Sequence, residues 1–225
     1  GWPLPPLTPA SLEEEAVTSA EFIRLYAESE FQPQQWFPVD VATPGAWGLG
    51  VPGGVMPDGA VRYVAPLGRE VSSYILHFDA PGNDPVNLSG EVTFGPDAVI
   101  LGVIFRSATL SATDDVLGDS FTRYPSANGT DRDWEMQQFG GFTVSPDRRT
   151  LSVVGRVGNY LDQMRIVVGS AADFPEIETY GCVQEITTPL TIPPEAPPSW
   201  EDCLVIVRGV TLTLSGHHQV RKLVV

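Results

Sequence analysis

Lysine and long apolar runs are nearly absent from this chain, and basic residues of any kind are few. Lys222 is the only lysine, and 13 basic side chains stand against 28 acidic ones, which gives a net charge of −15 at pH 7. This field repels phosphate backbones and anionic lipid surfaces, so we expect neither nucleic-acid nor membrane-surface binding. No apolar run approaches the length of about 20 residues that a membrane helix needs, so we expect no membrane span.

Cysteine is also scarce, since Cys182 and Cys203 are the only two, and they flank a proline-rich stretch. Such a loop has little regular structure of its own, and a disulfide across its ends would stabilise the fold by about 3 kcal/mol in the chain-entropy model. We predict this disulfide; two unrelated buried thiols are the alternative. An even cysteine count favours a secreted, extracellular or periplasmic setting. The first residues lack the features of a signal peptide, so we expect a mature chain.

Short segments rich in β-branched and aromatic residues dominate what is present. Val71–Asp79 and Val99–Ile104 predict buried strands, and because apolar residues occur at both odd and even positions in them, we expect both of their faces to be covered. Ser145–Arg149 predicts a turn. Further strands are predicted over 22–26, 90–94, 141–145, 150–156, 163–168, 181–186 and 203–214. The fold class that we predict is therefore all-β, an antiparallel β-sandwich or jelly roll.

One short helix is expected near residues 11–18, because Ser11 and Glu14 have capping-box spacing and consecutive glutamates suit a helix N-terminus. The domain organisation that we predict follows from these elements. Residues 1–18 form a Pro-rich arm with the short helix, 19–170 form the sandwich core, and 171–225 form the clipped loop and C-terminal strands on the same domain.

Several segments occur in an order that resembles a known family. They are Val39-Asp40 with Thr43-Pro44-Gly45, Ser73–Asp79, Ser89–Phe94 with Ile100–Ile104, Asp114-Asp115 with Leu117-Gly118, and Asp162–Ile166. This order resembles a family of exported bacterial proteins, most without an assigned activity, that often carry a PEP-CTERM cell-surface sorting tail. The match covers roughly residues 20–168 and implies an exported β-sandwich. After residue 170 the chain departs from the pattern and has no Val-Pro-Glu-Pro tail.

Two groups of polar residues suggest chemistry. Ser73, His77 and Asp79 share one face of a predicted strand, but a nucleophile normally lies on a sharp turn and no G-x-S-x-G is present, so we expect a hydrogen-bonded core histidine. Clustered carboxylates on loops suit Ca²⁺, although the spacing is not that of an EF-hand. The alternative is a solvated acidic loop or an aspartate-capped turn. The candidate calcium ligands are Asp114, Asp115, Asp119, Asp131, Asp133 and Glu135.

Aromatic residues in loops provide a third candidate site. Trp36, Trp47 and Trp134 are predicted either to stack on a ligand or to cover the ends of the core. Because no compact catalytic or cofactor signature accompanies the strands, we expect no enzyme. We expect a non-catalytic extracellular structural or assembly module of a bacterial surface, matrix or larger complex, with a protein partner or self-assembly. The alternatives are a carbohydrate-binding, lectin-like β-sandwich and a glycan-active jelly-roll hydrolase.

Overall fold

The fold is all-β, as the sequence predicts. The computed structural model describes residues 5–31, 36–66, 68–82, 84–125, 132–137, 139–157, 161–175, 179–180, 182–192, 203–207, 209–214 and 222–224. The one helix among them is α1 (Ser107–Leu117). The strands are β1 (Arg24–Phe31), β2 (Phe37–Val39), β3 (Gly45–Trp47), β4 (Arg62–Val64), β5 (Val71–Phe78), β6 (Val86–Thr93), β7 (Ala98–Ile104), β8 (Gly141–Val144), β9 (Thr150–Val157), β10 (Asp162–Ser170), β11 (Thr179–Tyr180), β12 (Cys182–Ile186), β13 (Leu190–Ile192), β14 (Cys203–Val207), β15 (Leu212–Leu214) and β16 (Lys222–Val224).

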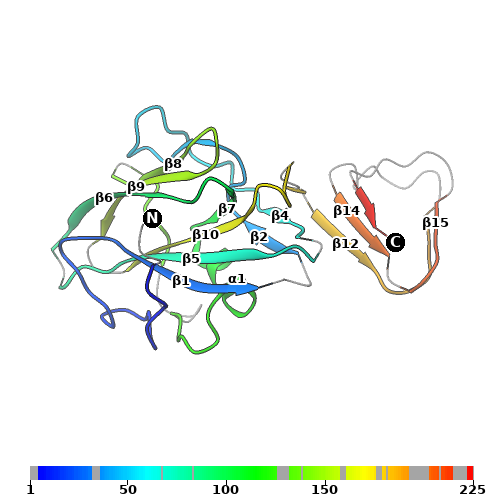
Figure 1. Ribbon diagram of the computed structural model, residues 1–225, viewed down its shortest axis with the longest axis horizontal. Helices are drawn as coiled ribbons and strands as arrows, with labels where there is room; N and C mark the ends of the chain where they lie inside the picture. The colour runs from blue at the N-terminus through cyan, green and yellow to red at the C-terminus, as the bar shows by residue number, and fades with distance from the viewer. Residues whose placement is uncertain are drawn as a thin grey trace.

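Two four-stranded antiparallel sheets form the body (Figure 1). The first has the order β1-β5-β10-β7, and the second has the order β3-β8-β9-β6. Large apolar side chains from both sheets make one buried cluster, to which Leu76 and Phe78 of β5 and Phe142 of β8 contribute. Because side chains alternate along a strand, this cluster uses only one face of β5.

The opposite face of the first sheet is covered as well. Val167 of β10 packs with Val39 of β2 and Leu110 of α1 in a second cluster. Ile75 of β5 packs with Leu12, which comes from the segment before β1. The first sheet is therefore a central layer, and the prediction that both faces of its apolar strands are covered is confirmed.

The prediction of an N-terminal helix near residues 11–18 is wrong, because these residues form no helix. Residues 13–16 form a single turn, in which the Ala16 N–H donates to the Glu13 carbonyl at 3.0 Å. Glu15 then has a φ of 62°, in the left-handed region that ends a helix. Its N–H donates to the carboxylate of Asp79, the residue after β5, at 2.6 Å, so a contact with this residue replaces the helical hydrogen bond.

The segment from β12 onward adds parallel pairing that the sequence did not indicate. β14 lies between β12 and β16, and β13 pairs with β15, all in parallel. These strands lie beside the two-sheet body in Figure 1, with a small apolar cluster of their own that includes Ile186 and Val205. The single strand predicted over 203–214 is wrong, because the chain turns at Gly209, whose φ is 62°, and so divides it into β14 and β15.

Candidate functional site

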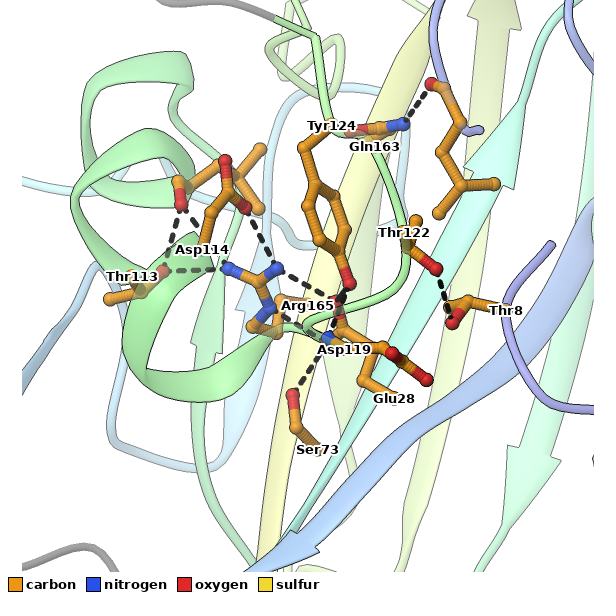
Figure 2. A network of polar contacts seen from close by, with 12 residues as sticks. Thr8, Glu28, Ser73, Thr113, Asp114, Asp119, Thr122, Tyr124, Gln163 and Arg165 are labelled. Carbon is orange, nitrogen blue, oxygen red and sulfur yellow. Dashed lines mark hydrogen bonds and ion pairs between the residues drawn. The ribbon is translucent and has the colours of Figure 1, made fainter. Parts of the chain in front are cut away.

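A network of buried charges lies on the face of the first sheet that α1 covers, between β1, β10 and α1 (Figure 2). Its centre is Arg165 of β10, whose side chain is fully buried. The guanidinium donates from Nε and Nη2 to the two carboxylate oxygens of Glu28, both at 2.7 Å. It also donates to Asp114 at 2.9 Å and to the Thr113 hydroxyl at 2.7 Å. Arg165 therefore joins β1, β10 and α1 through charged hydrogen bonds.

Tyr124 and Arg132 complete this network from the chain that follows α1. The Tyr124 hydroxyl donates to Glu28 at 2.7 Å and accepts from the Asp119 N–H at 2.8 Å. Burial, and then the negative charge of Glu28, raise the pKa of Tyr124 above its ordinary value. Arg132 is also fully buried and pairs with Asp114 at 2.7 Å. Its guanidinium and that of Arg165 lie 5.6 and 5.4 Å from the Tyr124 ring centre, within cation–π range.

The network pairs its charges with one another. Burial alone lowers the pKa of Arg165, but the negative charges of Glu28 and Asp114 outweigh it and raise that pKa, so the guanidinium stays charged. Ser73 donates its hydroxyl to Glu28 at 2.6 Å, which commits that hydroxyl to the same carboxylate. These hydrogen bonds and ion pairs hold α1 and the loop that follows it against the first sheet.

His77 is a buried, hydrogen-bonded histidine, as predicted. Its Nε2 donates to the Val17 carbonyl at 3.1 Å, and its Nδ1 accepts from the Gln163 amide at 3.0 Å. Burial lowers the pKa of His77 to about 4. Ser73 contacts Glu28 instead of His77, and Asp79 contacts the Glu15 backbone. The three residues on this strand face therefore have separate partners, and they do not form a triad.

The acidic residues predicted as calcium ligands lie in different structural settings. Asp114 and Asp115 belong to α1, so the prediction that they lie in a loop is wrong. Asp114 is paired with two arginines. Asp119 accepts from the Phe121 N–H at 2.7 Å, which is the aspartate-capped turn named above as the alternative. Asp133 accepts from the Ser107 N–H.

Among the described residues no three metal-ligating side chains come together. Glu135 accepts a hydrogen bond from the Gln137 N–H at 3.0 Å, and residue 131 lies outside the described residues. Calcium binding by this set stays a prediction.

The start of α1 is held by the carboxylate of Asp40, a residue that the sequence analysis named in the family pattern but not as a candidate site residue. Asp40 directly follows β2, and its side chain accepts from the backbone N–H groups of Phe105 and Arg106 at 2.8 and 2.9 Å. It also accepts from the Thr109 hydroxyl at 2.8 Å. A negative charge at this position complements the positive end of the helix dipole. The signal that could have indicated this residue is its position directly after an apolar strand.

The three tryptophans differ in exposure. Trp134 is 1% exposed and donates its Nε1–H to the Val154 carbonyl at 2.8 Å, so the prediction that it stacks on a ligand is wrong. Trp36 is half-buried and packs edge-on against Tyr63, with ring centres 5.0 Å apart. Trp47 is half-buried and packs against the main core. Trp47 lies in β3 rather than in a loop and agrees with the alternative that these aromatics cover the core, whereas the contact of Trp36 with Tyr63 is compatible with either prediction.

Four exposed apolar side chains lie on the two hydrogen-bonded loops that flank β3 and β8, and we call them the apolar ridge; the guanidinium of Arg156 lies 4.3 Å from the ring centre of one of them, Phe139. The ridge consists of Leu49, Val55, Met56 and Phe139, which are between 41% and 59% exposed. Backbone hydrogen bonds join the loops, from Leu49 to Met136 at 2.8 Å and from Gly50 to Gly140 at 2.9 Å. A Cβ at Gly50 would lie 2.5 Å from the backbone nitrogen of Gly140, so only glycine permits this close approach of the two loops.

Cys182 and Cys203 lie directly opposite each other in the parallel register of β12 and β14. Neighbouring strands are about 4.8 Å apart, a separation that falls within the range of Cα distances that a disulfide spans. The backbone geometry therefore suits the pair, and the disulfide stays a prediction.

Comparison with protein-family models, curated proteins and solved structures gave no match. Within the described segments, α1 is too short to cross a membrane and no other helix is found.

Proposed function

We propose that this chain is a non-catalytic structural module that assembles with further copies of itself outside the cell. The observation that carries the proposal is the apolar ridge. Exposed apolar side chains that gather at one place on a soluble protein commonly mark a contact surface. Because the glycine contacts hold the two loops in one arrangement, little conformational entropy would be lost when the ridge is buried.

The charge distribution favours a second copy as the occupant of the ridge. Residues 41–57 contain no charged side chain, although the chain as a whole carries a net charge of −15. Two copies that approach elsewhere bring like charges together, which opposes association. The stretch that carries three of the four ridge residues adds no charge to this repulsion, and salt screens what remains over about 8 Å at physiological ionic strength.

The buried network supports the non-catalytic part of the proposal. Glu28, Asp114, Arg132 and Arg165 are engaged with one another, and His77 is engaged with the backbone of residue 17. Burial lowers the pKa of His77 and of Arg132, and the negative charges of Glu28 and Asp114 raise the pKa of Arg165 against the effect of its burial. Perturbed groups of this kind also occur in structural ion-pair networks, which is the role that their internal pairing supports here.

Sedimentation velocity over a concentration series tests the proposal. We expect the protein to associate, and we expect Leu49→Glu and Val55→Glu each to weaken association at least about tenfold, since a contact worth about 1.4 kcal/mol is lost. Phe121→Glu is the matched control, because Phe121 is 88% exposed, lies outside the ridge and receives the same added charge. A monomer at every concentration, or equal weakening by all three variants, contradicts the proposal.

The extracellular setting is proposed on the cysteine pair. If Cys182 and Cys203 form a disulfide, alkylation of the non-reduced, denatured protein adds no label, and alkylation after reduction labels both cysteines. Two labels without reduction contradict the disulfide and remove this support for an oxidising compartment.

A carbohydrate-binding module is the second proposal, and Trp36 with Tyr63 carries it. Their edge-to-face pair is half-buried and leaves aromatic surface exposed beside β2 and β4. A glycan array with wild type and Trp36→Ala tests it: binding that the substitution abolishes favours the lectin. Release of reducing sugar by the wild type would instead favour the glycan-active hydrolase.

A further inference from the structure

Residues 5–19 run from the edge of the first sheet, beside β1, onto the face of that sheet that α1 also covers, and we call them the strap. Leu7 forms a parallel bridge with Ala27 of β1, and Leu12 is fully buried against Tyr26 and Ile75. The next residues, 20–22, are exposed. The strap is therefore a separate segment that packs against the sheet and leads into β1 through an exposed connection.

Three side chains of β5, β10 and the residue after β5 hold the strap backbone. Gln163 donates its amide to the Leu12 carbonyl at 3.0 Å, and His77 donates Nε2–H to the Val17 carbonyl at 3.1 Å. Asp79 accepts from the Glu15 N–H at 2.6 Å. Two titratable side chains and one amide that contacts the first of them thus hold the strap to the sheet at residues 12–17, while backbone hydrogen bonds join residues 6–12 to Ala27 and Arg123.

The bond directions at His77 are fixed by its partners. A carbonyl can only accept, so Nε2 carries the proton and Nδ1 is bare. Gln163 therefore presents its NH₂ group to Nδ1, and the same NH₂ group donates to Leu12. The amide oxygen Oε1 of Gln163 is buried and has no hydrogen-bond partner among the residues that the structure describes. This orientation of Gln163 satisfies the strap and His77 together only while His77 is neutral.

We propose that protonation of His77 releases the strap from the sheet. A proton on Nδ1 would face the NH₂ group of Gln163, two donors against each other. Rotation of the amide would bring Oε1 to Nδ1–H, but Oε1 would then also face the Leu12 carbonyl, which would lose its donor while buried. Neither orientation satisfies all groups, whereas an open strap lets water solvate them.

The effect of pH on strap opening follows from the difference between the pKa of His77 in the closed state and in the open state. Burial first, and then the positive charges of Arg24 and Arg132, lower the pKa of His77 to about 4, against the opposing effect of the Val17 carbonyl. The open state, with His77 solvated near its ordinary pKa of about 6.5, binds the proton more readily. Acid therefore favours opening as the pH falls from about 6.5 to about 4, and adds nothing below that.

Asp79, two residues after His77, has the opposite effect on opening. Burial raises the pKa of Asp79, and so do Glu14 and Glu15 of the strap, against the effect of the Glu15 N–H. Asp79 therefore takes up a proton more readily in the closed state and opposes opening in acid. Asp162 lies next to Gln163, at the end of β10 paired with Phe78. The release that we propose is carried by His77 alone.

Hydrogen–deuterium exchange of the full chain at pH 7 and pH 4.5 tests the proposal, after correction for intrinsic exchange rates. The reporters are the amides of Leu12, which donates to Arg123 at 2.9 Å, and of Glu15. For one linked proton we expect the strap to open on the order of 50-fold more at pH 4.5. Amides of β8 and β9 serve as the internal reference and should change far less.

Two variants and one titration decide the outcome. His77→Gln should abolish the pH dependence of strap opening, and Asp79→Asn should leave the step above pH 4.5 in place. If His77→Gln does not fold, the His77 ring resonances of the wild type are titrated by NMR instead, and we expect an apparent pKa well below 6.5. An ordinary pKa, equal strap protection at both pH values, or joint opening of the strap and β8–β9 overturns the proposal.

Discussion

Single side chains join segments of this protein that lie far apart in the sequence, and Arg165 does so most extensively. It contacts Glu28 of β1 and both Thr113 and Asp114 of α1 (Figure 2). Removing a buried ion from water costs several kcal/mol, and its partners must compensate for that cost. The network therefore makes packing on this face depend on each of its members.

Arg165→Met should be strongly destabilising. The substitution leaves Glu28 buried without its cation, and breaking a buried pair in this way costs about 3–5 kcal/mol. Arg62→Met is the control, because Arg62 forms an exposed pair with Asp58 that is worth about 0–1 kcal/mol. Urea denaturation of both variants measures the difference. Equal midpoints for the two would show that the buried network does not hold the fold.

The sequence predicted His77 correctly but not the charged network. His77 follows the apolar residues Ile75 and Leu76 in a strand, which favours a core position with a hydrogen-bond partner. Arg165 sits between Met164 and Ile166 in an equally apolar strand, which is the signal that could have indicated a buried charge. Its partners could not be inferred, because Glu28 and Asp114 reach it only through the pairing of strands and the position of α1.

At the scale of elements, the sequence predicted none of the short strands β2, β3 and β4, and it did not predict the helix α1. Its residues include Ser, Thr, Asp and Val, which have weak helix propensity. Its stability comes from outside the helix, because Asp40 caps its first turn and Arg165 donates to the Leu110 carbonyl at 3.2 Å. The segment 11–18 shows the reverse case, where a helical pattern is overridden by burial of Leu12 and by the contact between Glu15 and Asp79.

Asp40→Ala should destabilise α1 and, through it, the covered face of the sheet. It removes the acceptor of two backbone N–H groups and of the Thr109 hydroxyl, and a single charged hydrogen bond of this kind is worth about 1.5–3 kcal/mol, so we expect a loss of at least about 2 kcal/mol. Asp115→Asn is the control, since Asp115 is exposed in the same helix and should change stability by about 0.5 kcal/mol or less. Thermal melts compare the two variants. Similar melting temperatures would contradict the capping role of Asp40.

At the scale of the whole molecule, the two-sheet body was predictable and its additions were not. Runs such as Val99–Ile104 are apolar at nearly every position, so they indicate central strands whatever their neighbours are. The parallel pairing of β12, β14 and β16 depends on strands separated by long connections, which alternation along one strand does not reveal. The apolar ridge arises where two loops meet, so no single segment of the sequence indicates it.

Oxidation of methionine by dilute peroxide is the most direct test of assembly through the ridge. The chain has three methionines, of which Met56 is 49% exposed on the ridge, while Met136 and Met164 are 5% and 0% exposed. Sulfoxide formation requires access of the oxidant to sulfur, so the two buried residues serve as internal controls. We predict that Met56 oxidises rapidly in dilute protein and several-fold more slowly in concentrated, associated protein. Equal oxidation of Met56 at both concentrations, in protein shown by sedimentation to be associated, would contradict assembly through the ridge.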